Sequence, residues 1–249
     1  MKLLIDIGNT AVKIMSLNDE RLSFVTRFYL KDLSFDKLDK ELLNLVEIED
    51  VIISSVVPYI NSQFSKYFQD KYNLTPRYIK IGDYPELKLN IDNPNELGID
   101  LYCDIIAGLD YAQKEHKPVL VIDLGTASKI LLVYENKTFS SCAILPGINM
   151  CKKMLSSSTA MLPDVDQRDI KKVTEAANTV DVINSSVYYG HVEMINGLIN
   201  RIEKEINQEC LYLITGGNAE QIYKDLKKPN LYRPYLCFEG MHKIINFKG

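Results

Sequence analysis

Two stretches of this chain combine an aspartate, a glycine and small polar residues in a spacing suited to binding phosphate. The first covers residues 6–10 (DIGNT) and lies between the apolar run 3–5 and the alternating segment 12–15. We expect two strands joined by a tight hairpin, because glycine and asparagine tolerate the positive φ angles that such turns demand. Backbone amides and polar side chains in the turn can donate to phosphate oxygens, while Asp6 can face a metal ion or an attacking water. An ordinary hairpin turn is the simpler alternative.

The same arrangement recurs near the middle of the chain. There the apolar run 119–122 leads into residues 123–127 (DLGTA), and another apolar strand follows at 130–133. An internal repeat of this kind predicts two similar subdomains, each presenting one hairpin to a shared cleft. Paired phosphate hairpins resemble the superfamily of sugar kinases, acetate kinases and actin. The expected fold class is therefore α/β, with two ribonuclease H-like (actin-like ATPase) subdomains and the nucleotide cleft between them.

Composition narrows the classes of partner. The chain has 249 residues, of which 46% are apolar and 25% are charged, enough for one large domain or two small ones, and we expect two. A net charge of −4 gives no broad basic footprint for nucleic acid. No apolar run reaches the roughly 18 residues of a membrane span, and the sequence starts with a strand pattern where a signal peptide would need charged and apolar regions. We expect a cytoplasmic protein with no nucleic acid or membrane partner.

The thiol and imidazole groups show no metal-binding spacing. The five cysteines are widely spaced among apolar residues, and neither a Cys-x-x-Cys nor a His-x-x-x-His pattern occurs. This arrangement indicates reduced, mostly buried thiols and argues against a structural zinc site. The three histidines lie far apart in sequence, so we expect surface or packing roles for them.

Hydrophobic periodicity gives the remaining elements. In the first half we expect strands at 21–30, 51–53 and 77–81, helices at 35–46, 59–72 and 97–114, and an irregular loop at 83–95. In the second half we expect strands at 119–123, 127–134, 138–145 and 211–214, and helices after residue 147, at 178–205 and from 219. A boundary near 115–117 would give subdomains 1–116 and 117–249. The first would hold the first hairpin; the second would hold the second hairpin, the turn at residues 215–218 and the long helix from 178.

Two glycine patterns in the second half allow alternatives. Gly190 and Gly197 lie seven residues apart on one face of the long helix, a spacing that permits close helix approach inside the domain or across a dimer. The intradomain interpretation is favoured on sequence alone. Gly216 and Gly217 follow a strand and precede a helix, so a flat or phosphorylated ligand could lie against bare backbone there, unless the pair only forms a tight turn.

Six motifs in order carry a family resemblance across nearly the whole chain. They are residues 6–10 (DIGNT), Asn93-Pro94 with Gly98-Ile99-Asp100, residues 123–127 (DLGTA), Pro146-Gly147-Ile148, Asn178-Thr179 and Thr215-Gly216-Gly217. Together they resemble the type III pantothenate kinases, also called the Bvg accessory factor family. The resemblance implies ATP-dependent phosphorylation of pantothenate to 4′-phosphopantothenate, the first step of coenzyme A biosynthesis. It also implies a homodimer that uses Mg²⁺ and a monovalent cation, K⁺ or NH₄⁺.

The resemblance also assigns roles to individual residues. The ATP-binding set it implies is Asp6, Ile7, Gly8, Asn9, Thr10, Ala11, Val12, Lys13, Thr126, Gly216 and Gly217. The pantothenate-binding set is Gly98, Ile99, Asp100, Leu101 and, reaching in from the neighbouring subunit, Thr179. Asp123 would hold the monovalent cation, and Asp6 would orient Mg²⁺ directly or through water. For Lys13, the alternative to offsetting phosphate charge is a solvated lysine on a strand.

Asp100 aligns with the catalytic aspartate of the family. It lies at the predicted start of a helix, where the helix dipole keeps a carboxylate ionised and able to accept the hydroxyl proton. A helix-capping aspartate is the alternative. Given the family resemblance, we favour the role of general base for Asp100.

Three positions depart from the family pattern. Leu101 stands where the family usually has an arginine, and Ile91 stands where many members have a tyrosine. Both departures fall on the pantothenate side. Lys129 stands where small hydroxyl residues are common. Two alternatives to pantothenate kinase therefore stay open: a degenerate, ATP-binding regulatory member without efficient transfer, and a kinase for another small alcohol.

Overall fold

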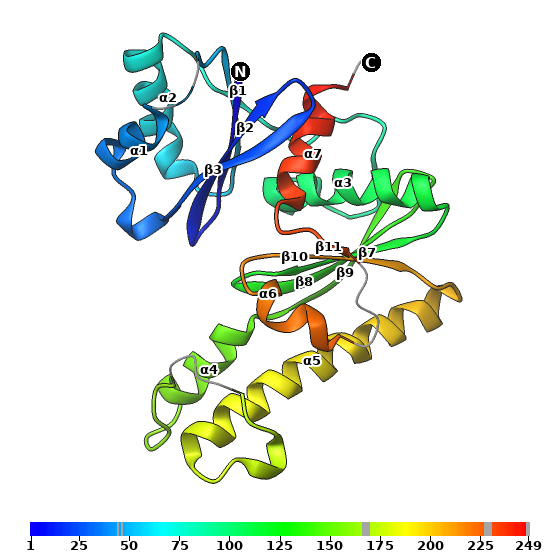
Figure 1. Cartoon of the computed structure of the whole chain (residues 1–249). Helices are drawn as coiled ribbons and strands as arrows, with labels where there is room; N and C mark the ends of the chain where they lie inside the picture. The colour runs from blue at the N-terminus through cyan, green and yellow to red at the C-terminus, as the bar shows by residue number, and fades with distance from the viewer. Residues whose placement is uncertain (44, 46, 166–169, 227–230, 248–249) are drawn as a thin grey trace. The chain divides into compact units, whose positions relative to one another are not determined.

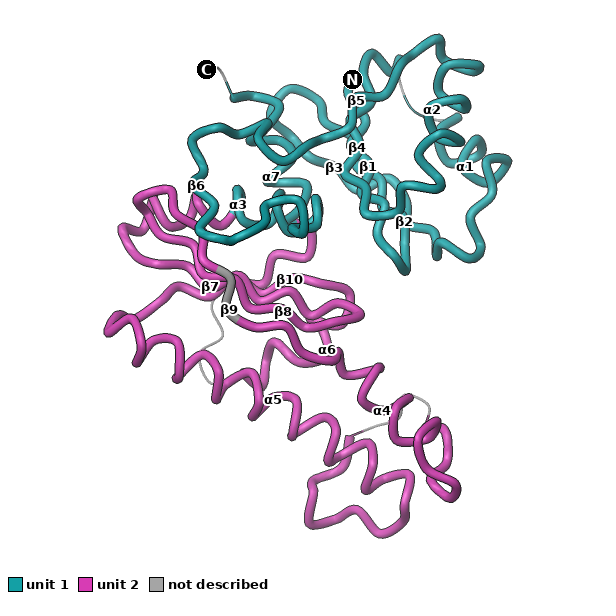
Figure 2. The backbone as a smooth tube through the Cα atoms, turned by 180° about the vertical axis from the view of Figure 1, so that it is seen from behind, with its two compact units in different colours: residues 1–107, 236–249 teal, residues 108–235 magenta. Residues whose placement is uncertain are grey.

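The computed structural model describes residues 1–43, 45, 47–165, 170–226 and 231–247 (Figure 1). The chain forms two compact units. Unit 1 comprises residues 1–107 together with the C-terminal segment from Leu236, and unit 2 comprises residues 108–235 (Figure 2). None of the helices in the described part of the chain is long and apolar enough to cross a membrane.

Unit 1 contains a mixed five-stranded sheet with the strand order β3-β2-β1-β4-β5. These strands are β1 (Lys2–Ile7), β2 (Ala11–Asn18), β3 (Arg21–Tyr29), β4 (Asp50–Ser55) and β5 (Arg77–Tyr78). β1 pairs antiparallel with β2 and parallel with β4. Because β1 has neighbours on both sides, five of its six residues are buried, which explains the near-continuous apolar run in its sequence.

Two helices of unit 1 supply the core against this sheet. They are α1 (Phe35–Leu42) and α2 (Pro58–Tyr72). Phe64 and Phe68, one turn apart on α2, are fully buried in a cluster with apolar residues of β1, β2 and β4. The amphipathic spacing that predicted both helices is therefore confirmed, although the predicted end of the first, at residue 46, lies outside the described residues.

Two further helices of unit 1 approach each other closely. They are α3 (Ile99–Glu115), whose last residues belong to unit 2, and α7 (Leu236–Ile245). A Cβ atom at Gly240 of α7 would lie 1.8 Å from the carbonyl oxygen of Cys103 on α3, so only glycine allows this contact. The same unit holds β6 (Lys88–Leu89) and the 3₁₀ turns η1 (Leu30–Asp32) and η2 (Pro94–Glu96).

Unit 2 is built on a second mixed sheet, within which its strands follow the order β11-β10-β7-β8-β9. They are β7 (Val119–Leu124), β8 (Ala127–Val133), β9 (Thr138–Pro146), β10 (Leu211–Thr215) and β11 (Leu231–Tyr232). All six residues of β7 are buried. The antiparallel register of β7 and β8 places Asp123 directly opposite Lys129.

The long helix α5 (Thr179–Ile206) covers the sheet of unit 2 (Figure 1). Its buried face contributes Tyr188, Val192, Ile195 and Ile199 to the core. The helix α4 (Ile148–Ser157) packs on α5, and the unit is completed by η3 (Val173–Glu175), α6 (Ala219–Ile222) and η4 (Tyr223–Asp225). No atom of the described chain lies within 4 Å of a Cβ built at Gly190 or Gly197. The interpretation of these glycines as an intradomain close approach is therefore wrong.

The observed elements confirm an α/β fold with two mixed sheets. The two units differ from the expected subdomains 1–116 and 117–249, because unit 1 ends within α3 and takes α7 from the end of the chain. The sequence pattern gave no hint of α7. Its place in unit 1 depends on packing against α3 and β1, and no local pattern encodes such contacts.

Burial of His191 generates a prediction about stability and pH. His191 is 3% exposed on α5, and its Nε2 atom lies 3.0 Å from the hydroxyl oxygen of Ser128. Burial lowers the pKa of His191 below its ordinary value of 6.5. The unfolded chain then binds a proton more readily than the folded chain, so this histidine costs no stability above about pH 6.5 and reduces stability as the pH falls below it.

We therefore expect the thermal unfolding midpoint of the wild-type protein to decrease as the pH is lowered from about 7 to about 5.5. His191 should contribute at most about 1.4 kcal/mol per pH unit to the slope of the free energy of unfolding. His191→Gln should make this decrease smaller. The control, His116→Asn at an exposed histidine with a φ angle of 52°, should leave the decrease unchanged. Unfolding followed by circular dichroism across this range measures the slope. Equal slopes in wild type and His191→Gln would contradict the prediction.

Candidate functional site

The first hairpin joins β1 to β2. Ile7 pairs with Val12, so four residues form the loop, and the backbone amide of Gly8 donates to the carbonyl oxygen of Ala11 at 3.0 Å. None of the loop residues has a positive φ angle, so the expectation that Gly8 and Asn9 adopt such angles is wrong. The physical reason is the loop length, since four-residue loops are most often built on a type I turn with negative φ angles. Asn9 and Thr10 are exposed at its tip.

Asp6 and Lys13 face each other across this hairpin. They are cross-strand partners, and the Lys13 ammonium lies 4.0 Å from a carboxylate oxygen of Asp6. Asp6 is 7% exposed, whereas the Lys13 side chain keeps 22% of its surface in solvent. A buried carboxylate with a cation nearby and exposed backbone amides next to it is a suitable arrangement for a phosphate group.

Asp100 is the second residue of α3. Its Oδ1 atom accepts a hydrogen bond from the backbone amide of Leu101 at 2.8 Å, and the backbone amide of Tyr102 donates to the carbonyl oxygen of Gly98. The helix therefore starts at the predicted place. Asp100 interacts with an amide of the first turn, as a capping residue would, but this bond uses one of its two oxygens and leaves both proposed roles compatible with the geometry.

A second carboxylate lies one turn further along α3 and was missed in the sequence. Asp104 is 5% exposed. Burial raises the pKa of the Cys103 thiol, a hydrogen bond with Cys237 lowers it, and the negative charges of Asp104, Asp6 and Asp100, all in unit 1, raise it further. The signal available in the sequence was the spacing of four residues between Asp100 and Asp104, which places both on one face of a helix.

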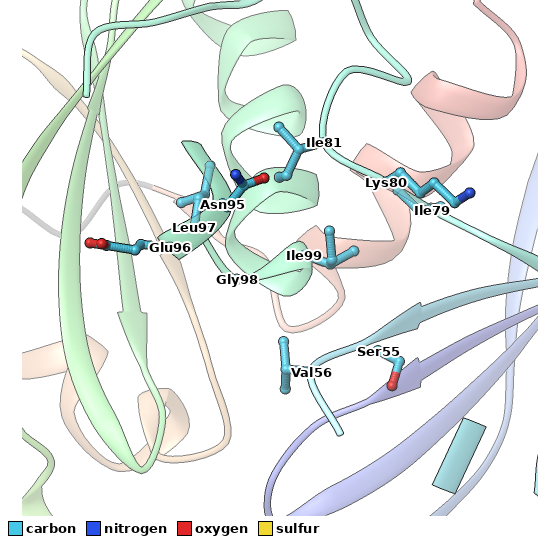
Figure 3. Close-up of a pocket in the computed structure, with 10 residues that line it drawn as sticks. All are labelled: Ser55, Val56, Ile79, Lys80, Ile81, Asn95, Glu96, Leu97, Gly98 and Ile99. Atoms are coloured by element: carbon cyan, nitrogen blue, oxygen red, sulfur yellow. The ribbon is translucent and has the colours of Figure 1, made fainter. Parts of the chain in front are cut away.

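A pocket of about 450 Å³ opens beside the start of α3 (Figure 3). Its walls come from the end of β4, the segment after β5 and the turn before α3. The lining residues are Ser55, Val56, Ile79, Lys80, Ile81, Asn95, Glu96, Leu97, Gly98 and Ile99. Two of these, Gly98 and Ile99, belong to the predicted substrate set, whereas Leu101 and Ile91 are not among the lining residues. Lys80 is the only cation among the ten.

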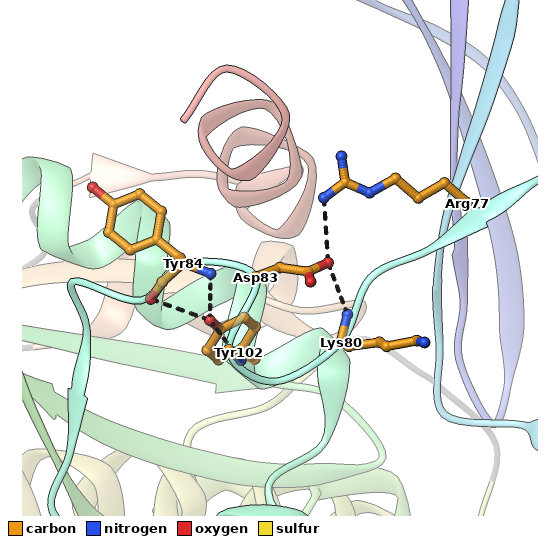
Figure 4. A network of polar contacts seen from close by, with 6 residues as sticks. Arg77, Lys80, Asp83, Tyr84 and Tyr102 are labelled. Atoms are coloured by element: carbon orange, nitrogen blue, oxygen red, sulfur yellow. Dashed lines mark hydrogen bonds and ion pairs between the residues drawn. The ribbon is translucent and has the colours of Figure 1, made fainter. Parts of the chain in front are cut away.

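Hydrogen bonds to a buried tyrosine fix the segment after β5 (Figure 4). The Tyr102 hydroxyl accepts from the backbone amides of Gly82 at 3.1 Å and Tyr84 at 2.9 Å. The Asp83 carboxylate accepts from the backbone amide of Lys80 at 3.1 Å and from Arg77 at 3.4 Å. The bonds to Tyr102 tie the pocket wall to α3. They explain why this large aromatic residue is buried there.

The second hairpin joins β7 to β8, and neighbouring loops hold it from two sides. The backbone amide of Gly147 donates to the carbonyl oxygen of Thr126 at 3.1 Å, and a Cβ at Gly147 would lie 2.3 Å from that oxygen. The side-chain amide of Asn218 donates to the carbonyl oxygen of Gly125 at 2.8 Å. Three of the sequence motifs therefore meet here within unit 2, and Thr126 is left exposed at the tip.

The glycine turn after β10 lies against the base of this hairpin. Gly216 has a φ angle of +98°, and a Cβ there would lie 2.5 Å from both the Asp123 carboxylate and the backbone of Leu124. The bare backbone at Gly216 is thus used by the chain itself for close packing. Gly217 is exposed and offers the surface on which a ligand could lie.

Asp123 already has a cation of the chain beside it. The Lys129 ammonium lies 2.7 Å from the Asp123 Oδ2 atom, and both side chains are mostly buried. The resemblance assigns a monovalent cation to this aspartate. With an ammonium group in hydrogen-bonding contact, Oδ2 does not fit a second cation, so the donor set disagrees with that assignment.

Thr179 begins α5 in unit 2. Its neighbour Asn178 caps the helix, accepting from the backbone amide of Asp181 at 3.0 Å, and Asp181 also pairs with Lys171 at 2.6 Å. Thr179 itself is exposed. Within the described residues no group of three or more His, Cys, Asp or Glu side chains is arranged to hold a metal ion.

The predicted site residues thus form two groups. Asp6 to Lys13 and Gly98 to Leu101 belong to unit 1, while Asp123, Thr126, Thr179, Gly216 and Gly217 belong to unit 2. Sequence reasoning missed Asp104, Ser55 and Lys80. Ser55 ends β4 and Lys80 follows β5, positions where side chains of neighbouring parallel strands meet at one sheet edge.

Two mixed sheets, each with an aspartate-bearing hairpin, define the class of proteins with an actin-like ATPase fold. Several solved structures share the fold. A Baf family protein from Campylobacter jejuni has a TM-score of 0.59 at 19% identity, covering 98% of this chain and 96% of that one. The component A of (R)-2-hydroxyglutaryl-CoA dehydratase from Acidaminococcus fermentans has a TM-score of 0.51 at 12% identity, covering 97% and 94%.

Sequence comparison gives the family. The sequence model described as "Type III pantothenate kinase" matches residues 2–201. A type III pantothenate kinase from Persephonella marina is 34% identical over 81% of this chain and 78% of that protein, and one from Acholeplasma laidlawii is 32% identical over 98% of both. The chain belongs to the type III pantothenate kinase family. The resemblance and the enzyme class expected from the sequence are thereby confirmed.

Proposed function

We propose that this chain transfers the γ-phosphoryl group of ATP to the 4′-hydroxyl of pantothenate. The product is 4′-phosphopantothenate, and the step opens coenzyme A biosynthesis. The observation that carries the proposal is the place of Asp100 at the start of α3, next to the pocket wall formed by Gly98 and Ile99 and in the same unit as Asp6. A proton acceptor, an acceptor pocket and a phosphate hairpin are the parts that a small-alcohol kinase needs.

Phosphoryl transfer needs alignment and charge neutralisation more than covalent chemistry. The turn residues 8–10 and 125–126, of which Asn9, Thr10 and Thr126 are exposed, offer backbone amides and hydroxyl groups to the β- and γ-phosphates. Lys13, close to Asp6 and partly exposed, can offset their negative charge. The exposed Gly217 and its neighbour Gly216 form the surface for the adenosine part of ATP.

The residues of unit 1 fit a magnesium ion. Mg²⁺ is usually held by one or two carboxylates together with waters and substrate phosphates, so a protein cage of three ligands is unnecessary. Asp6 provides a buried hard oxygen donor beside the phosphate turn. When bound, Mg²⁺ would neutralise the phosphate charge that develops during transfer.

Asp100 takes the proton of the attacking hydroxyl in this proposal. The oxygen that does not bond to the Leu101 amide is the candidate acceptor, and the N-terminus of α3 favours the ionised form that the role requires. Leu101, in place of arginine, favours one alternative, a regulatory member that binds ATP without efficient transfer. A coupled assay with Mg²⁺-ATP, pantothenate and a panel of small alcohols tests the proposal, and turnover of another alcohol in preference to pantothenate would overturn it.

We predict that Asp100→Asn lowers kcat roughly 10²- to 10⁴-fold while leaving folding and ATP binding intact. Asparagine caps helices about as well as aspartate, so a purely capping role predicts almost no effect. Asp92→Asn, an exposed carboxylate in the preceding loop, serves as the matched control. Steady-state kinetics and thermal unfolding on the same samples separate the two roles, and an unchanged kcat in Asp100→Asn would end the general-base assignment.

The pocket offers a substitute for the guanidinium missing at position 101. Lys80 is the only cation among the ten lining residues, and its side chain is exposed, so its ammonium is available to a ligand. Its backbone is fixed by the bond to Asp83. Lys80 would attract the carboxylate of pantothenate as a point charge, without the paired donors of arginine.

Lys80→Ala should accordingly raise KM for pantothenate by about tenfold, the size of one charge-assisted contact, with little change in kcat. The alcohol analogue pantothenol lacks the carboxylate, so its KM should be nearly the same in both proteins. Lys88→Ala removes an exposed lysine of the same unit and should behave like wild type. An equal rise in KM for pantothenate and pantothenol would show that Lys80 does not recognise the carboxylate.

We also propose that the chain works as a homodimer that uses the exposed face of α5. Thr179 lies on this face, Val182 keeps 46% of its surface exposed, and within the described residues nothing beyond the helix itself lies within 4 Å of a Cβ built at Gly190 or Gly197. Small residues at such a spacing let a second helix approach closely. The family resemblance assigns Thr179 to the pantothenate site of the neighbouring subunit, which requires such a dimer.

Val182→Arg should then shift the protein towards monomer and lower activity, because it places an uncompensated charge in the interface. Leu231→Arg, at a sheet-edge position that is 38% exposed, is the control. Light scattering at assay concentrations measures the mass directly. A wild-type protein that is monomeric there would contradict the proposal.

A further inference from the structure

We infer that the Lys129 ammonium takes the place of a bound monovalent cation at the second hairpin, so that this enzyme does not depend on potassium. The kinetic part of this inference rests on the proposed function. The structural part stands on the contacts around Asp123 in unit 2 alone.

The first observation is the ion pair itself. Lys129 Nζ lies 2.7 Å from Asp123 Oδ2, and the two side chains keep only 19% and 12% of their surface exposed. A carboxylate this far from water needs a cation close by, because burial removes its hydration. Lys129 supplies that charge from the adjacent strand, where the register of β7 and β8 places it directly opposite Asp123.

The second observation concerns the carbonyl oxygens next to Asp123. Carbonyl oxygens are the usual ligands of potassium in proteins. The oxygens of Leu124 and Gly125 accept from the backbone and side-chain amides of Asn218, each at 2.8 Å, and that of Thr126 accepts from Gly147 at 3.1 Å. The chain therefore satisfies these oxygens with its own donors.

The third observation is the packing around the other carboxylate oxygen. A Cβ at Gly216 would lie 2.5 Å from Asp123 Oδ1, and one at Gly125 would lie 3.4 Å from it. Backbone thus crowds Oδ1, while the lysine occupies the neighbourhood of Oδ2. A tethered ammonium provides one positive charge at this point at any salt composition, whereas a free cation must be bound from solution.

The experiment compares potassium chloride with tetramethylammonium chloride. Equal ionic strength keeps general charge screening the same, and tetramethylammonium is too large for the site. Two readouts are taken on the full chain: the thermal unfolding midpoint without substrates, and phosphorylation of pantothenate with tetramethylammonium salts of ATP. For the wild-type protein we expect midpoints within about 1 °C of each other and rates within about twofold.

Three variants sharpen the comparison. Lys129→Ser opens the space and should lose roughly tenfold or more in activity in tetramethylammonium, with recovery and a rise in midpoint of about 4 °C or more in potassium. Lys129→Met fills the space without a charge, so its activity should stay low in both salts. Lys114→Ser removes a lysine from the exposed ion pair with Asp110, of similar length at 2.6 Å, and should show no specific response to potassium.

Two results would overturn the inference. One is a wild-type protein that potassium stabilises specifically or activates about tenfold; the other is a folded Lys129→Ser protein that responds to potassium in neither readout. If Lys129→Ser does not fold, the wild-type and Lys129→Met measurements still decide the question. An absence of pantothenate turnover in both salts would contradict the proposed function, while the midpoints would continue to test the role of Lys129.

Discussion

A buried carboxylate at the end of a central strand needs a positive charge within reach, and both halves of this chain meet that constraint in the same way. Asp6 and Asp123 are the next-to-last residues of β1 and β7, and each is less than 10% exposed. In each hairpin the antiparallel register sets a lysine opposite the aspartate, Lys13 at 4.0 Å and Lys129 at 2.7 Å. Both lysine side chains are mostly buried, with 22% and 19% of their surface exposed, but of the two only Lys129 lies within hydrogen-bonding distance of its aspartate.

Glycines hold the surroundings of the second carboxylate in place. Gly216 and Gly147 each bring backbone within a distance of the hairpin that a side chain would block, and Gly240 does the same between α7 and α3. Such contacts exclude water from the aspartates and fix the carbonyl oxygens of the hairpin. The exposed tips at Asn9, Thr10 and Thr126 remain available to a ligand because the rest of each hairpin is held by packing and hydrogen bonds.

The departures from the family pattern have different consequences in the two units. In unit 1, Leu101 is not among the residues that line the pocket, whereas Lys80 is. At the second hairpin, Lys129 forms an ion pair with Asp123. Neither departure touches the turn of the first hairpin.

The sequence by itself determined the two hairpins, most of the longer strands and helices, the place of Asp100 in the first turn of α3 and the family. These follow from local patterns: apolar runs of period two or 3.6, turn residues and capping residues act over a few neighbouring positions. The absence of positive φ angles in the first turn was missed, because register and loop length decide the turn type and the residue types alone do not.

Only the tertiary structure decided which distant groups meet. It placed α7 in unit 1, set Asp6, Asp100 and Asp104 in the same unit, made Lys80 a lining residue of the pocket and left Gly190 and Gly197 without close neighbours from other described elements. It also gave Lys129 a consequence that the sequence could not. The identity of a residue is local, but the charge it meets across a sheet is set by strand pairing and burial, which depend on the fold as a whole.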